Sequence, residues 1–172
     1  MCIRDRAEII KNASKSNKIV VVVSAMGGET NRLVDLAKAF GDDPDKREFD
    51  ALVSTGETVS SALLTMALHS KGVKAKSFSA SQISMRTTSS YSKAKILDVD
   101  AKKILDVVEN DTIPIITGFQ GVTEGGDVTT LGRGGSDTTA VAIAAQIAAT
   151  RCDIFTDVDG IFTTDPSVVP NA

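Results

Sequence analysis

The segment of the chain with the clearest chemical potential is residues 131–140 (LGRGGSDTTA). Its three glycines free the backbone so that several N–H groups can converge on an anion. Ser136 or Asp137 can cap the helix that follows, whose N-terminus carries about half a positive charge. Arg133 supplies a guanidinium fork that suits a carboxylate or a phosphate. These features predict an anion-binding corner at a helix start, the alternative being a flexible turn with an ordinary cap.

This corner differs from the two commonest phosphate-binding loops. A Walker A loop needs a Gly-Lys-Ser or Gly-Lys-Thr triplet, and the sequence contains neither. The dinucleotide-binding pattern needs a glycine where Asp137 stands. The sequence therefore points to anion recognition of another kind.

A second polar segment, residues 156–160 (TDVDG), follows an apolar stretch that we expect to be a strand. Carboxylates at the carboxyl edge of a parallel sheet lie where open α/β sheets bind their ligands. Asp157 and its neighbour Asp159 could orient a nucleotide or help to hold Mg²⁺, which prefers oxygen ligands. A solvated Asp-Gly turn is an equally simple interpretation.

Two more junctions between expected elements carry polar side chains. Ser24 and Thr30 lie on either side of a Gly-Gly pair and offer hydroxyls at the same sheet edge, although a strand, a turn and a Thr-capped helix would explain them as well. Glu57 ends the segment 54–57 (STGE) and could receive an ammonium group. Alternatively, Glu57 simply stabilises the first turn of its own helix.

The composition is that of one globular domain rather than a disordered or fibrous chain. The 172 residues are 42% hydrophobic and 24% charged. A net charge of −3 and an aromatic content of 4% argue against binding to nucleic acid or to an anionic membrane. The longest nearly apolar run, residues 140–149, is about half of the ~20 residues that would span a bilayer, and no signal segment opens the chain. We expect a cytoplasmic location.

The sequence offers no set of residues for nucleophilic or zinc chemistry. Its two cysteines, Cys2 and Cys152, are too few for a disulfide scaffold or a zinc cluster, and we expect Cys152 in the core. The only histidine, His69, stands late in an expected helix and is predicted at the surface. The sequence therefore argues against acyl transfer by a Ser–His–Asp triad and against zinc chemistry.

Alternating strands and helices must position these groups. Continuous β-branched runs without polar alternation indicate strands buried on both faces, as in a parallel sheet. The pattern predicts an α/β layered fold. Strands are expected at 18–24, 73–78, 96–99, 113–117, 128–131 and 153–156, and helices at 7–16, 30–41, 58–70, 101–109 and 137–150.

The order of the motifs SAMGGETN, TGE, GFQG, LGRGGSDTTA and TDVDGIFTTDP resembles the catalytic domain of bacterial aspartate kinases, of the amino-acid-kinase superfamily, from about residue 18 to 172. The last two motifs are highly specific. The resemblance implies a three-layer α/β/α sandwich around a mainly parallel sheet. It also implies ATP-dependent, Mg²⁺-assisted phosphorylation of the β-carboxylate of L-aspartate, the first step towards lysine, threonine and methionine.

The resemblance further implies a role for each matching residue. Arg133 would grip the α-carboxylate of aspartate, Glu57 would meet its ammonium group, and Asp137 would organise the reacting groups and Mg²⁺. Further substrate contacts would come from Ser24, Thr30, Gly134, Gly135 and Ser136, and nucleotide contacts from Thr156, Asp157, Phe162 and Asp165.

The chain departs from the family in several places. Relatives open with a strand carrying a Lys-Phe-Gly-Gly motif, and many carry Tyr and Arg where this chain has Phe162 and Ser167. We expect residues 7–172 to be a partial catalytic domain that lacks this strand, and residues 1–6 to be a non-native start. We also expect the regulatory ACT domains to lie outside the sequence. A parent protein would form homo- or hetero-oligomers through those domains. The chain alone is then expected to be catalytically impaired. The alternatives are a non-catalytic aspartate- and nucleotide-binding module, or a kinase of this fold for glutamate, acetylglutamate or UMP.

Overall fold

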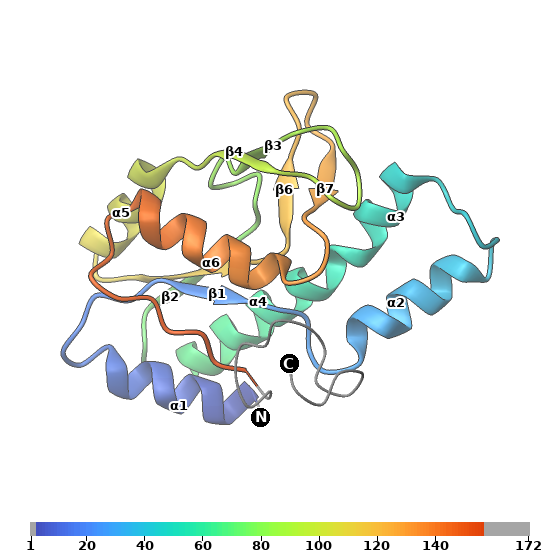
Figure 1. Cartoon of the computed structure of the whole chain (residues 1–172). Coiled ribbons are helices and arrows are strands. Elements are labelled where there is room, and N and C mark those ends of the chain that lie inside the picture. Colours follow the sequence, from blue (N-terminus) through green and yellow to red (C-terminus); the bar gives the residue numbers. More distant parts are fainter. Residues whose placement is uncertain (1–2, 157–172) are drawn as a thin grey trace, which may run out of the picture.

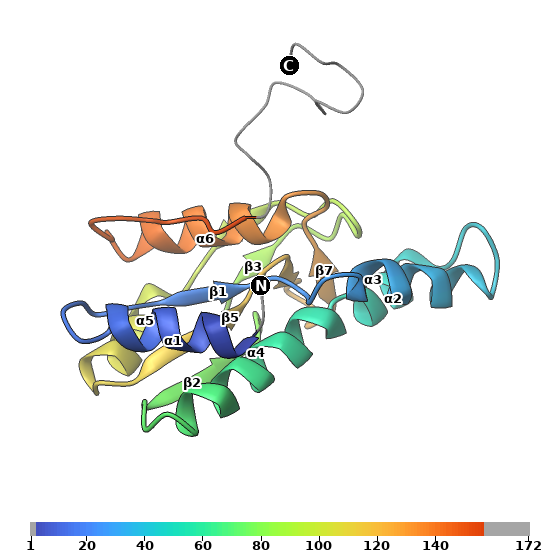
Figure 2. The same cartoon turned by 90° about the horizontal axis from the view of Figure 1, so that it is seen from below.

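The computed structural model describes residues 3–156, which form three layers (Figures 1 and 2). The middle layer is a parallel sheet with the strand order β1-β5-β2. Helices α1 and α4 pack on one face of this sheet, and α5 and α6 pack on the other. The expected α/β/α sandwich around a mainly parallel sheet is confirmed.

The central strand, β5 (Ile113–Thr117), is buried at every residue, as the unbroken apolar run IPIIT predicts. It lies between β1 (Val21–Val23) and β2 (Ala75–Phe78) and runs parallel to both. The bounds expected for β5 are confirmed, whereas β1 and β2 are shorter than the apolar runs that contain them.

Successive side chains of β5 serve two different cores, because the side chains of a strand point alternately to opposite faces. Ile115 packs with Leu64 and Leu68 of α4 and with Ala7 of α1. Ile116, the next residue, packs instead against the side of the sheet that α5 and α6 cover. The second cluster includes Ile83, Ile104 and Ile143.

The helices are α1 (Ile3–Ala13), α2 (Glu29–Lys38), α3 (Lys46–Val53), α4 (Thr55–His69), α5 (Ala101–Glu109) and α6 (Gly135–Gln146). Helix α5 has the expected bounds. Helix α3 was not expected, since the charged, proline-containing stretch before it resembles a loop. Its start is fixed by Asp45, whose side chain accepts the Glu48 N–H at 3.1 Å. The Asp-x-x-Glu spacing is the sequence signal that would have predicted it.

A second, four-stranded sheet with the order β4-β3-β6-β7 lies beside the first. Its strands are β3 (Arg86–Thr87), β4 (Ile96–Asp98), β6 (Gln120–Val122) and β7 (Val128–Thr130). Strands β6 and β7 form an antiparallel hairpin, and β7 leads directly into the glycine-rich segment. Strands β3 and β6 are too short to show the periodicity by which a strand is predicted.

The strand expected at 153–156 and the core position expected for Cys152 are both wrong. Residues 151–156 have no regular secondary structure and are exposed, with Ile154 46% and Phe155 71% exposed. Cys152 is exposed with them. An apolar run forms a strand only when a neighbouring strand accepts its backbone hydrogen bonds, and the local pattern does not contain that information.

One helical stretch of the described chain, Lys46–His69, has the length and mean hydropathy to cross a membrane. It comprises α3 and α4, and half of its most apolar window (50%) is buried within the fold. Because α4 packs against both α1 and the parallel sheet, its apolar character belongs to a core helix.

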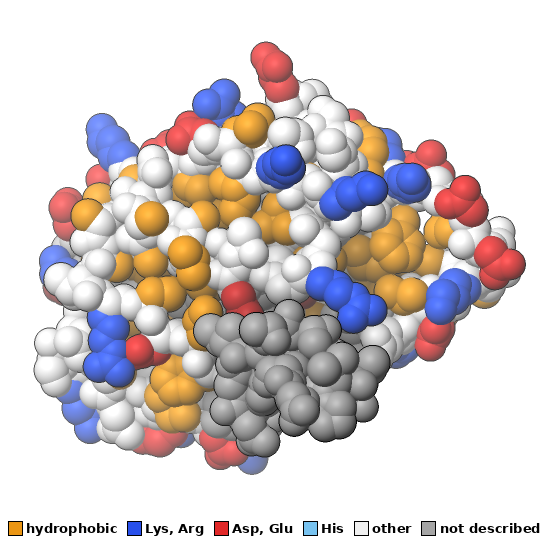
Figure 3. Space-filling view, viewed as in Figure 1, with side chains coloured by type: hydrophobic (Ala, Val, Ile, Leu, Met, Phe, Trp, Pro, Cys, Tyr) orange, Lys and Arg blue, Asp and Glu red, His pale blue; other side chains and the backbone are white. Residues whose placement is uncertain are grey.

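Hydrophobic side chains also reach the surface, over α6 and between α2 and α3 (Figure 3). Leu36 of α2 is 47% exposed, Phe40, just beyond the helix, is 93% exposed, and Val141 of α6 is 54% exposed.

Candidate active site

The carboxyl ends of β1 and β5 bring several of the predicted segments together. Val23 lies opposite Thr117 in the parallel register, and the Gly118 N–H donates to the Val23 carbonyl at 2.9 Å. Residues 24–28 therefore leave β1 beside the point where Gly118 and Phe119 leave β5. This is the edge at which open α/β sheets bind ligands.

Glu57 reaches this edge from the first turn of α4, and it is only 3% exposed. Its Oε1 accepts the Ala25 N–H at 3.0 Å, while Oε2 is buried and has no hydrogen-bond partner among the described residues. Burial raises the pKa of Glu57 to about 7, because desolvation outweighs the backbone hydrogen bonds that lower it. A role confined to stabilising the helix start does not account for this burial. The arrangement suits a cationic ligand group at Oε2.

The start of α4 is pressed against the loop that follows β1. A Cβ placed on Gly56 would lie 2.9 Å from the Ala25 Cβ, so only glycine permits this approach. Two more buried oxygens, Ser60 Oγ and Thr117 Oγ1, also have no partner in the described part of the chain. The sequence interpretation missed both residues, although Thr117 is the one polar residue of its apolar strand.

Two glycines in the left-handed conformation begin the helices that meet this edge. Gly28 (φ 79°) precedes α2 and Gly134 (φ 69°) precedes α6, and neither helix has a side-chain cap. The predicted caps are therefore wrong, since both helices start earlier than expected. Thr30, Ser136 and Asp137 instead lie within the first turns. The backbone N–H groups of Ser136 and Asp137 donate to no described residue, so they can meet an anion.

Helix α6 approaches the end of β5 through a contact that requires glycine. A Cβ on Gly118 would lie 2.8 Å from the Ser136 Cβ and 2.9 Å from its Cα. The contact brings the predicted substrate residues of the 134–136 turn to the same sheet edge as Glu57.

Phe119 lies between these elements and has a left-handed backbone (φ 66°), which is unusual for a residue with a side chain. The conformation is held at both ends: the Phe119 N–H donates to Thr139 Oγ1 at 3.1 Å, and its carbonyl accepts the Leu131 N–H at 2.9 Å. Phe119 was not predicted as a site residue. Its position between two glycines in the motif GFQG, where the chain must turn sharply, is the signal that could have indicated it.

Comparison with protein-family models shows which family the chain belongs to. Residues 1–172 match the model of the amino acid kinase family. The chain belongs to this family. It is 53% identical over 165 residues to an aspartate kinase of Pseudomonas putida, covering 96% of this chain and 40% of that protein. The chain thus spans less than half the length of this relative.

Solved structures of family members share the fold. The E. coli aspartokinase III in complex with aspartate and ADP matches 98% of this chain and 48% of its own, with a TM-score of 0.84 and 29% identity. The aspartate kinase of Synechocystis matches 98% of this chain and 28% of its own, with a TM-score of 0.78 and 42% identity.

The charged groups of the glycine-rich segment are available for ligands. Arg133 and Asp137 are exposed, and neither side chain makes an ion pair or hydrogen bond within residues 3–156. No group of three or more potential metal ligands occurs in that part of the chain. A single exposed carboxylate such as Asp137 fits Mg²⁺ carried by a nucleotide, because Mg²⁺ typically takes one or two carboxylates together with phosphate oxygens.

The predicted residues are brought together to different degrees. Glu57 and the 133–137 segment meet the edge formed by β1 and β5, and Ser24, exposed, directly follows β1. Thr156 is the last described residue, and it lies in the irregular, exposed stretch. Asp157, Phe162 and Asp165 lie outside the described residues.

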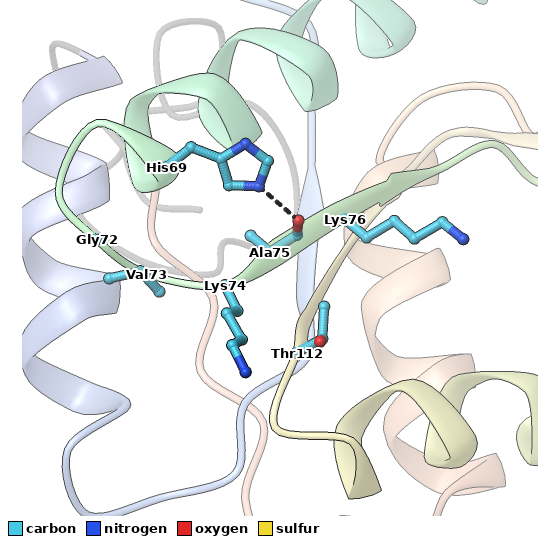
Figure 4. A pocket seen from close by; sticks show the side chains of 7 residues that line it. All are labelled: His69, Gly72, Val73, Lys74, Ala75, Lys76 and Thr112. Atoms are coloured by element: carbon cyan, nitrogen blue, oxygen red, sulfur yellow. Dashed lines mark hydrogen bonds between the residues drawn. The ribbon is translucent and has the colours of Figure 1, made fainter.

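A separate pocket of about 420 Å³ lies at the opposite end of β2 (Figure 4). His69, exposed as predicted, borders it and donates from Nε2 to the Ala75 carbonyl at 2.8 Å. Lys74 and Lys76 also border the pocket, which is open and lacks the carboxylate and glycine features of the edge described above. The sheet edge at β1 and β5 is therefore the candidate active site.

Proposed function

We propose that this chain carries the active site of an aspartate kinase, which transfers the γ-phosphoryl group of MgATP to the β-carboxylate of L-aspartate. The observation that carries the proposal is the buried Glu57 carboxylate, which presents an unpartnered oxygen at the sheet edge that the uncapped start of α6 also meets. A cation site next to an anion site suits an α-amino acid. The similarity to proteins named aspartate kinase, one of them solved with aspartate and ADP, supports the same substrates.

In the proposed reaction, Glu57 takes the ammonium group of aspartate and Arg133 takes its α-carboxylate through two hydrogen bonds. Ser24, Thr30, Gly134, Gly135 and Ser136 complete the substrate contacts. The β-carboxylate oxygen then attacks the γ-phosphorus, the bond to the bridging oxygen of ADP breaks, and 4-phospho-L-aspartate forms.

This transfer needs no general base, because the aspartate β-carboxylate is ionised at neutral pH. The remote position of His69, the only histidine, is consistent with that requirement. The work of the residues is positioning and neutralisation of phosphate charge. When bound, Mg²⁺ would neutralise that charge, and Asp137 is the residue proposed to hold it. Thr156, Asp157, Phe162 and Asp165 are proposed to contact the nucleotide.

Residues 7–172 are proposed to form part of an amino-acid-kinase catalytic domain. In a longer protein, ACT domains would supply regulation and oligomerisation, as the resemblance implies. The proposed setting is the cytoplasm, where the pathway to lysine, threonine and methionine begins with this product.

The test has two arms and uses the 172-residue chain. The first traps the acyl phosphate with hydroxylamine in the presence of MgATP and L-aspartate, with L-glutamate as the control substrate. The second measures thermal unfolding, since a ligand at about 100 times its Kd adds roughly 2.7 kcal/mol to the stability. Stabilisation by aspartate but not glutamate, with hydroxamate formed, supports the proposal. Stabilisation without product is the result expected of a catalytically impaired partial domain and of a binding module alike. The absence of both stabilisation and product would contradict the substrate assignment.

A further inference from the structure

Asp50 is a carboxylate with no contact to solvent (0% exposed), although it lies in α3 and outside the motifs on which the proposed function rests. Its Oδ2 accepts the backbone N–H groups of Ser92 and Thr130, both at 2.8 Å. Its Oδ1 accepts the hydroxyl groups of the same two residues, at 3.0 and 2.9 Å. Both oxygens are therefore satisfied by charge-assisted hydrogen bonds.

These contacts join three segments that are distant in the sequence. Ser92 is 42 residues and Thr130 is 80 residues from Asp50. Thr130 also accepts the Ala94 N–H at 2.9 Å through its carbonyl, so the loop after β3 is joined to the end of β7 directly as well as through Asp50. One buried side chain thus fixes the end of β7 against α3 and the 88–95 loop.

The segment fixed in this way leads directly to Arg133. Thr130 is the last residue of β7, and Gly132 follows with a left-handed backbone (φ 82°). A Cβ on Gly132 would lie 3.3 Å from the Ser92 carbonyl oxygen, so the same residue that Asp50 binds also borders the turn. The Gly135 N–H then closes the turn on the Gly132 carbonyl at 3.1 Å.

We propose that Asp50 is a positioning residue for the proposed kinase reaction: by binding Ser92 and Thr130, it sets the path of the 131–135 turn and hence the place of Arg133. The role of Arg133 in this proposal rests on the proposed function, whereas the effect of Asp50 on the path of the turn does not. A guanidinium forms two parallel hydrogen bonds to a carboxylate only when its position and orientation are well defined.

Asp50→Ala removes all four hydrogen bonds, whereas Asp50→Asn can retain them. The amide oxygen of asparagine can accept the two backbone N–H groups, and its NH₂ group can donate to the two hydroxyls, which then act as acceptors. Arg47→Ala is the matched control. Arg47 stands one turn earlier on α3 and ties the helix to the β6–β7 hairpin through an exposed ion pair with Asp127.

Hydrogen exchange of the 172-residue chain tests the positioning step without any ligand. We expect Asp50→Ala to accelerate exchange in residues 130–135, to leave 113–117 unchanged, and to be rescued by Asp50→Asn. Arg47→Ala should leave 130–135 as in the parent. Unchanged exchange at 130–135 in Asp50→Ala would overturn the proposal. If Asp50→Ala does not fold, Thr130→Val, which removes only one of the four bonds, takes its place with the same expectations.

Ligand affinity tests the consequence. We expect Asp50→Ala to raise the Kd for L-aspartate about tenfold and to change that for MgATP less than about twofold, with Asp50→Asn near the parent. A loosened turn with unchanged aspartate affinity, or an equal loss for both ligands, would contradict the positioning role. If the parent chain itself binds no aspartate, the proposed function fails, and the exchange result alone decides whether Asp50 fixes the turn.

Discussion

The Glu57 carboxylate accepts the backbone N–H of Ala25, 32 residues earlier in the chain, at 3.0 Å. This bond joins the start of α4 to the loop that follows β1. It occupies one carboxylate oxygen and leaves Oε2 buried without a partner in the described chain. The bond to Ala25 orients the carboxylate, and the remaining oxygen is the group that a substrate ammonium would meet.

The raised pKa of Glu57, about 7, predicts how the free energy of unfolding depends on pH. Between pH about 4.5 and 7 the folded chain keeps this proton while the unfolded chain has lost it. The Glu57 contribution therefore stabilises the fold below pH 4.5 and is lost as pH rises to 7, by up to about 3 kcal/mol. Urea unfolding of Glu57→Gln should show a smaller decline over this range, whereas Glu109→Gln, at an exposed position at the end of α5, should match the parent. Parallel pH profiles for all three chains would contradict the assignment.

The same proton should control aspartate binding under the proposed function. Only the ionised carboxylate attracts an ammonium group, so the Kd for L-aspartate should increase about tenfold per pH unit below pH 7. Calorimetric titration from pH 5.5 to 8 measures this dependence. Glu57→Gln should bind weakly at every pH. A parent Kd that does not change with pH would rule out the pairing of Glu57 with the ammonium group.

Arg133→Ala should weaken L-aspartate binding by about 2 to 4 kcal/mol without lowering the melting temperature of the unliganded chain. The guanidinium is exposed and makes no ion pair within residues 3–156, so its loss removes no described contact. Arg86→Ala, which breaks an exposed pair with Asp98 on the second sheet, should keep the parent affinity. Equal affinities in all three chains would show that the α-carboxylate is bound elsewhere.

Gly118→Ala should destabilise the chain by about 1 to 3 kcal/mol and also weaken ligand binding. The added Cβ would meet the Ser136 Cβ at 2.8 Å, and only a shift of the α6 start relieves that contact. Gly27→Ala is the matched control, because nothing lies within 4 Å of its added Cβ. Thermal melts with and without aspartate compare the two variants. A Gly118→Ala chain as stable as the Gly27→Ala chain would disprove the close packing.

Thr139→Val should lower the free energy of unfolding by about 1 to 3 kcal/mol, because it deprives the Phe119 N–H of its acceptor in the interior. The neighbouring Thr138 provides the control: it is exposed, and its hydroxyl donates only to the Gly134 carbonyl. Thr138→Val should change the stability by less than about 0.5 kcal/mol. The prediction fails if chemical denaturation gives the two variants equal stability.

The amino-acid sequence by itself determined the layered fold and the central features of the site. The unbroken apolar run at 113–117 specifies a strand buried on both faces, and the amphipathic spacing of 101–109 specifies a helix. Glycines at 132 and 134 indicate a turn beside a helix start, since glycine adopts positive φ without the strain that a side chain brings. These are local properties of the backbone and of side-chain periodicity.

Tertiary structure decided which groups meet. The contacts of Glu57 with Ala25 and of Asp50 with Thr130 span 32 and 80 residues, and no local pattern encodes such a pairing. The composition of residues 153–156 predicts a strand, yet this stretch lies outside the sheet, so a local pattern does not by itself decide pairing. Backbone conformation is set by nearby residues, whereas burial and hydrogen-bond partners depend on how whole elements pack.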